Sequence, residues 1–95
     1  MSEDPSDVVR NNIALHRYEL DAGGATAFAN YRLAPGAVII THTETPLELR
    51  GRGIASTLVR GALQQIRAEG SKVVAGCAFV ADYLAKHPEE RDLLA

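Results

Sequence analysis

The chain has 95 residues, of which 46% are hydrophobic and 23% are charged, a composition that fits one small globular domain and not a chain that is disordered as a whole. Ten basic and twelve acidic residues give a net charge of -2 at pH 7, which argues against general nucleic-acid binding. The single cysteine, Cys77, excludes an intramolecular disulfide, and no apolar run approaches the roughly 18 residues of a membrane span. We therefore expect a cytoplasmic protein without a membrane partner.

The first half of the chain is expected to hold a tail and three strands. Residues 1–11 are predicted to form a flexible tail, too polar and acidic at its start for a signal or transit peptide, before a single domain over residues 12–95. Strands are expected at 12–20, 25–33 and 37–43, with glycine-containing turns between them. The third is β-branched and mostly apolar, which is typical of a central strand buried on both faces. Together they predict an antiparallel meander.

The second half is expected to alternate helix, strand and helix. Apolar residues between Ile54 and Ile66 fall on one face of a 3.6-residue helix, and Gly70 is a suitable stop. Residues 72–77 predict a short buried strand, which the crossover places parallel to the third. A second helix over 78–86 ends before Pro88. The predicted fold class is α+β: an antiparallel three-strand meander followed by a helix, a parallel fourth strand and a C-terminal helix.

The loop between the third strand and the first helix has features of an anion site. Gly51 and Gly53 allow a tight turn and leave space for a ligand. The unpaired amides at the start of the following helix attract phosphate groups. Basic residues also outnumber the single acid Glu69 in this region: Arg50, Arg52, Arg60, Arg67 and Lys72. Without a P-loop or a dinucleotide motif, these features fit both a small-anion site and a helix with a solvated basic face.

A family resemblance favours the first interpretation. Arg50-x-x-Gly53-x-Ala55 resembles the Gln/Arg-x-x-Gly-x-Gly/Ala motif of the GNAT superfamily of acetyl-CoA-dependent N-acetyltransferases. The loop is followed, in the order typical of the minimal single-domain GNAT family, by the runs Cys77-x-Phe79-Val80-x-x-Tyr83 and His87-Pro88-Glu89. The resemblance covers nearly the whole chain from residue 12.

The resemblance implies a minimal GNAT-like fold and an acyltransferase that moves an acetyl group from acetyl-CoA directly to an amine. In this superfamily the loop amides hold the pyrophosphate, and the pantetheine arm adds to the preceding strand like a further strand. The cofactor-binding residues implied here are Thr43, Thr45, Arg50, Gly51, Arg52, Gly53, Ile54, Ala55 and Ser56. No metal is implied.

His42 and Glu44 are the candidates for the base that takes the proton of the amine. They lie two residues apart on a strand and so project to the same side. An imidazole has an ordinary pKa near 6.5, so it needs a smaller pKa shift than a carboxylate to act as a base near pH 7. The structural alternative is that His42 forms a hydrogen bond in the core and Glu44 is solvated.

Cys77 and Tyr83 are the candidates for flanking the thioester. Cys77 lies at the start of the second helix. In the functional interpretation it is an activated thiol, which either accepts the acetyl group or lines its pocket. In the structural interpretation it is a small buried apolar residue. Tyr83 is the candidate acid for the departing thiolate, although packing against the sheet explains it nearly as well.

The acceptor is expected to be a small-molecule or protein amine, and the chain a monomer or a weak homodimer. Because the short chain lacks the extra substrate-binding elements of larger GNAT enzymes, its acceptor site is either shallow or completed by a partner chain. A non-catalytic module that binds coenzyme A or acyl-CoA is the main alternative. A general anion-binding or nucleotide-binding domain is a third.

Overall fold

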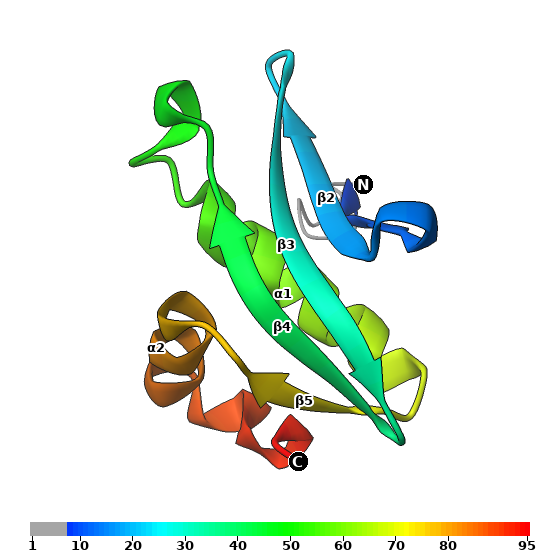
Figure 1. Ribbon diagram of the computed structural model, residues 1–95. Coiled ribbons are helices and arrows are strands. Elements are labelled where there is room, and N and C mark those ends of the chain that lie inside the picture. The colour runs from blue at the N-terminus through cyan, green and yellow to red at the C-terminus, as the bar shows by residue number, and fades with distance from the viewer. Residues whose placement is uncertain (1–7) are drawn as a thin grey trace, which may run out of the picture.

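The computed structural model describes residues 8–95 and shows a mixed five-stranded sheet with helices packed on it (Figure 1). The strands lie in the order β1-β2-β3-β4-β5, and the first four are antiparallel. The elements are β1 (Arg10–Asn12), η2 (Ile13–Leu15), β2 (Arg17–Ala22), β3 (Ala25–Ala34), β4 (Ala37–Glu44), η3 (Leu47–Leu49), α1 (Ile54–Ala68), β5 (Lys72–Ala75), α2 (Ala78–Lys86) and η4 (Pro88–Leu93), where η marks a 3-10 helix. No helix within residues 8–95 is long and apolar enough to cross a membrane. The predicted α+β class is confirmed.

The beginning of the domain differs from the prediction. The expected strand over 12–20 is interrupted by η2, so β1 and β2 form a hairpin that adds one antiparallel strand. The Asn12 side chain accepts a hydrogen bond from the Leu15 amide at 3.2 Å and so starts the 3-10 turn. The predicted tail is wrong at its end, because Arg10 and Asn11 belong to β1 and Val9 is buried in the core. The rest of that prediction, residues 1–7, lies outside the described residues.

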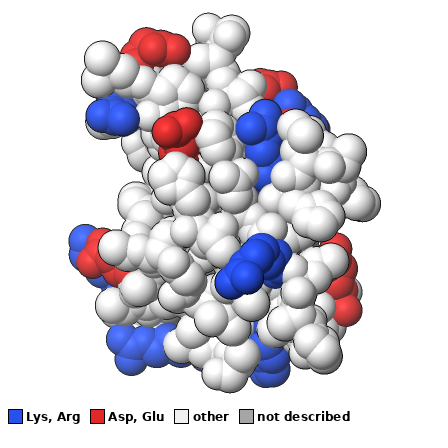
Figure 2. Space-filling view, viewed as in Figure 1, with Lys and Arg blue, Asp and Glu red and all other residues white. Residues whose placement is uncertain are grey.

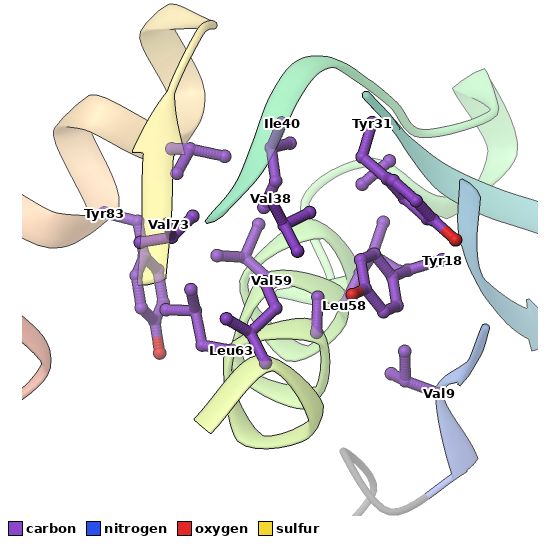
Figure 3. Close-up of a cluster of buried hydrophobic side chains, with 14 of the residues drawn as sticks. Val9, Tyr18, Tyr31, Val38, Ile40, Leu58, Val59, Leu63, Val73 and Tyr83 are labelled. Carbon is purple, nitrogen blue, oxygen red and sulfur yellow. The ribbon is translucent and has the colours of Figure 1, made fainter. Parts of the chain in front are cut away.

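The core lies between one face of the sheet and α1. Figure 1 shows α1 running across this face, and Figure 3 shows its side chains between those of the strands. The apolar positions predicted for this helix include its fully buried residues, which are Leu58, Val59, Ala62, Leu63 and Ile66. β4 contributes Val38 and Ile40 to the core, but Ile39 on its other face is only partly buried. The prediction that this strand is buried on both faces is therefore wrong, because α1 covers one side of the sheet.

β4 and β5 are parallel, as predicted, but they pair over only a short length. The pairing runs from Ala37 opposite Lys72 to Ile40 opposite Ala75. The chain then passes through Gly76, whose amide donates to the Ile40 carbonyl at 2.8 Å, and turns into α2. β4 instead continues to Glu44. Beyond Ile40 the two strands diverge, which leaves one edge of β4 without a strand partner (Figure 1).

Candidate functional site

A cavity of about 520 Å³ opens at the end of β4, where β5 has diverged from it. Its wall combines the end of β4, the η3 segment, the loop before α1 and the first turn of α1, with one residue from α2. The lining residues are His42, Thr43, Glu44, Thr45, Leu49, Arg50, Gly51, Gly53, Ile54, Ala55, Ser56 and Phe79. The topology thus places the loop that was singled out in the sequence next to the free edge of β4.

The loop presents main-chain donors to this cavity. Gly51 and Gly53 have φ angles of 82° and 72°, in the left-handed region that glycine adopts without strain. A Cβ at either position would meet no atom within 4 Å, so the backbone conformation and not a shortage of space requires these glycines. Among the hydrogen bonds of residues 8–95, none is donated by the main-chain amides of residues 51–56. Together with the positive end of α1, these amides are suited to bind phosphate oxygens.

The predicted cofactor-binding residues come together, with one exception. Arg52 is exposed and does not line the cavity. Arg50 does line it, and its Nε donates to the carbonyl oxygen of Thr45 at 3.1 Å, which ties the loop to the end of β4. Leu49 and Phe79 are lining residues that sequence reasoning missed. Their apolar character indicated only that they would be buried.

His42 and Glu44 reach the cavity because of an irregularity in the sheet. The register between β3 and β4 shifts at Asn30 and Tyr31, so that even-numbered β4 residues face the core before the shift and solvent after it. Their side chains are 57% and 55% exposed, and His42 Nε2 lies 3.8 Å from Glu44 Oε1. Both predicted base candidates are therefore on one side of the strand and accessible. The alternative of a core hydrogen bond for His42 does not fit this exposure.

Cys77 and Tyr83 do not line this cavity. Cys77 is the residue before α2, and its free thiol is half-buried against the hydrophobic core. Tyr83 is only 7% exposed and lines a second hollow, where its ring stacks on that of His87. Burial raises the pKa of Tyr83, the nearby Glu90 raises it further, and the Arg60 charge opposes this effect. The structure thus brings two of the four predicted catalytic residues to the cavity.

The charge around the site is mixed. Figure 2, which views the uncovered face of the sheet, shows Lys and Arg side chains scattered among Asp and Glu side chains. Within residues 8–95, no group of three or more His, Cys, Asp or Glu side chains is placed to hold a metal ion. Because this face carries charges of both signs, the positive potential at the cavity comes from groups in its own wall, which are the loop amides, the N-terminus of α1 and Arg50.

Comparisons with known proteins agree with this architecture. A sequence model of a protein family described as GCN5-related N-acetyl-transferase matches residues 17–93. The solution NMR structure of a GCN5-like protein from Staphylococcus aureus, an inferred N-acetyltransferase, superimposes with a TM-score of 0.66. At 22% sequence identity the match covers 95% of this chain and 90% of that one, which shows a shared fold. No curated protein sequence matches the chain.

Proposed function

The chain belongs to the family of GCN5-related N-acetyltransferases, and we propose on this premise that it transfers an acetyl group from acetyl-CoA to an amine. The observation that carries the proposal is the shared cavity. Its lining includes Gly51 and residues 53–56, whose main-chain amides donate none of the hydrogen bonds within residues 8–95, and it also includes the accessible side chains of His42 and Glu44. A site for an anionic carrier and a candidate base for an amine therefore face the same space.

The chain's own residues account for holding the carrier. The amides of the loop and of the first turn of α1 would bind the diphosphate of coenzyme A, with Arg50 at the rim. The free edge of β4 at Thr43 and Thr45 leaves main-chain groups for the amide-containing arm, which would lie along it as an added strand. Bound acetyl-CoA supplies an activated acetyl thioester. Phe79 and Leu49 provide an apolar wall for that end.

His42 or Glu44 would act as the base that takes a proton from the acceptor amine. An alkyl ammonium must lose a proton before its nitrogen can attack a carbonyl carbon, and both side chains are open to solvent, where that proton can leave. The half-exposed position fits an acceptor that approaches from outside the cavity, either a small amine or the amine of a protein. Replacing His42 by Ala and Glu44 by Gln, singly and together, identifies which side chain does this work.

Direct transfer is the mechanism that we propose. Cys77 is absent from the cavity lining, so an acetyl-cysteine intermediate would require the thiol to leave its position against the core. A Cys77→Ala variant should therefore retain acetyl transfer. Loss of transfer with normal acetyl-CoA binding and an acetylated Cys77 in the wild-type protein would contradict direct transfer.

The test of the function measures binding and turnover separately. Calorimetry with acetyl-CoA should show saturable binding, and a panel of amines should give acetylated product above the hydrolysis background. The His42→Ala, Glu44→Gln double variant should bind acetyl-CoA normally and lose on the order of 100-fold in turnover. Two of the four candidate catalytic residues, Cys77 and Tyr83, lie outside the cavity, as they could in a protein that binds the carrier without catalysis. Binding of acetyl-CoA without turnover of any amine would therefore favour a coenzyme A-binding module. No binding up to millimolar acetyl-CoA would end the proposal.

A further inference from the structure

A row of side chains crosses the uncovered face of the sheet, the face seen in Figure 2, at the position of the candidate bases. Glu19 on β2 lies opposite Phe28 on β3, which in turn lies opposite Glu44 on β4. The alternate residues of β2 and β3 are buried in the core, so this row points to the other side of the sheet. Side chains directly opposite each other on antiparallel strands have Cβ atoms about 4.5–5.5 Å apart. Phe28 is therefore an immediate neighbour of Glu44 and of an amine bound there.

The guanidinium group of Arg17 lies over the ring of Phe28. Its Cζ atom is 4.4 Å from the ring centroid. Its Nε donates a hydrogen bond to Glu19, and its two Nη atoms donate none of the hydrogen bonds within residues 8–95. The side chain is 28% exposed. A guanidinium that lies over a ring keeps its N–H groups in its own plane, so Arg17 can bind an acceptor group beside the ring through Nη.

A buried carboxylate holds this arginine in place. Glu19 is only 3% exposed, although it lies on the face that no helix covers. It accepts hydrogen bonds from Arg17 and from Asn12, the latter at 3.1 Å, and it pairs with Arg10 at 2.7 Å. Arg10 also pairs with Asp21 at 2.6 Å, so the cluster of two arginines and two carboxylates is neutral as a whole. Because Arg17 is already fixed, less side-chain entropy is lost when a ligand binds to it.

The groups on the two sides of Phe28 are opposite in charge. The carboxylate of Glu44 is 55% exposed, and no ion pair within residues 8–95 joins it to Arg17. An acceptor amine arrives as an ammonium group, which Glu44 attracts, and a guanidinium binds a carboxylate through two parallel hydrogen bonds. A free amino acid carries both groups a few bonds apart and matches this pair. A simple alkyl amine, or the side chain of a protein lysine, has no carboxylate of its own for Arg17.

We propose that the acceptor is a free amino acid, with its amine at His42 and Glu44 and its carboxylate on Arg17. This inference rests on the proposed function and names the substrate class of that same site. Arg17 binds the carboxylate directly, and Glu19 is a positioning residue that holds Arg17 over Phe28. Arg17 and Glu19 lie outside the cavity lining, so the acceptor lies across the mouth of the cavity, where the candidate bases are exposed.

The experiment compares pairs of acceptors that differ only in a carboxylate. Glycine and ethylamine form one pair, and γ-aminobutyrate and n-butylamine form another, because a methyl group replaces the carboxylate in each alkyl amine. Acetyl transfer from saturating acetyl-CoA gives kcat and KM for the wild type and for Arg17→Met. Arg17→Lys is a second variant, which keeps a positive charge beside Glu19 but loses the planar pair of donors. Comparing the ratio of kcat/KM within a pair between variants cancels the different basicity of the two amines.

Two matched controls each remove one arginine. Arg10→Met takes a guanidinium from the same cluster, where it pairs with Glu19. Arg32→Met takes one from an exposed position of β3, on the same side of the strand as Phe28. The first control reports the effect of weakening the cluster, and the second reports the effect of removing a positive charge from this face.

In the wild type we expect the amino acid of at least one pair to have the lower KM. Arg17→Met should lower kcat/KM for that amino acid about tenfold, through KM and not kcat, which is the size expected for a lost hydrogen bond to a charged group. Arg17→Lys should show a smaller loss in the same direction. The matched alkyl amine should be unaffected, and both controls should leave the ratio within the pair unchanged.

An equal loss for both members of each pair in Arg17→Met and Arg17→Lys would overturn the inference, because the cluster would then serve only the stability of the sheet. A wild type that acetylates the alkyl amines as well as the amino acids would also overturn it and would leave the proposed function intact. No acetylation of any amine by protein that binds acetyl-CoA would overturn both.

Discussion

Replacing Gly76 by Ala should open the fork between β4 and β5 at a measurable cost. A Cβ at this position would lie 2.8 Å from the carbonyl oxygen of Ile40, whereas ordinary contact begins near 3.4 Å, so the two chains must separate by about 0.6 Å. That same oxygen accepts the Gly76 amide at 2.8 Å, and the displacement weakens this hydrogen bond. Overpacking costs about 1–3 kcal/mol and a weakened hydrogen bond about 1 kcal/mol. The reduced entropy of the unfolded chain returns about 0.4–1 kcal/mol.

The net expectation is a loss of about 1–3 kcal/mol in the free energy of unfolding, measured by urea denaturation with an unchanged slope. Acetyl-CoA binding should also weaken, because α2 carries Phe79 away from the opposite wall of the cavity. Gly23→Ala is the control: its φ of 61° carries a strain of about 1 kcal/mol, but no neighbouring atom lies within 4 Å and the site is remote from the fork. If Gly76→Ala is as stable as the wild type, the close approach does not constrain the fork and the reasoning fails.

Three further outcomes are expected. Gly53→Ala and Gly36→Ala, with φ angles of 72° and 69°, should lose a similar free energy of unfolding, but only Gly53→Ala should weaken acetyl-CoA binding in calorimetry. Leu63→Ala should cost about 2–5 kcal/mol in urea denaturation, and a loss below 1 kcal/mol would mean that the core can collapse around the gap. Burial of Glu19 favours its neutral form, but hydrogen bonds from Arg17 and Asn12 and the charge of Arg10 outweigh it and lower the pKa of Glu19. The resulting stability is present above pH of about 4.5 and is lost as pH falls through the lower folded-state pKa, so the Glu19→Gln variant should show a shallower acid destabilisation.

The second half of the fold was predictable because its signals are local. The bounds predicted for α2, residues 78–86, agree with the structure, since Pro88 fixes the end and apolar spacing fixes the face. The helical period between Ile54 and Ile66 likewise marks the buried face of α1. The strand–helix–strand order was enough to predict that β4 and β5 are parallel.

The misses depend on pairing and packing between distant segments. β1 consists of three polar residues without the alternation of apolar and polar side chains that marks a strand in a sequence. It is a strand because it pairs with β2, for example through Arg10 opposite Glu19. The register shift that turns His42 outward is a property of two strands together and has no mark in either. Tyr83 was expected to face inward and does, but the second hollow that it lines, together with Arg60 of α1, depends on how α2 packs beside α1.

The short pairing of β5 has a consequence for motion. β5 joins β4 through four residue pairs, whereas the antiparallel ladder of β3 and β4 is much longer. Local stability in proteins is uneven, and weakly anchored units open before the rest unfolds. The segment from β5 to η4 is joined to the sheet by this short pairing and otherwise by side-chain packing, such as that of Val73 and Val80, so we expect it to open before the antiparallel strands do. It includes Phe79, which lines the cavity. Sub-global opening of this unit would admit bulky acyl chains or release product while the remainder of the sheet stays protected against amide exchange.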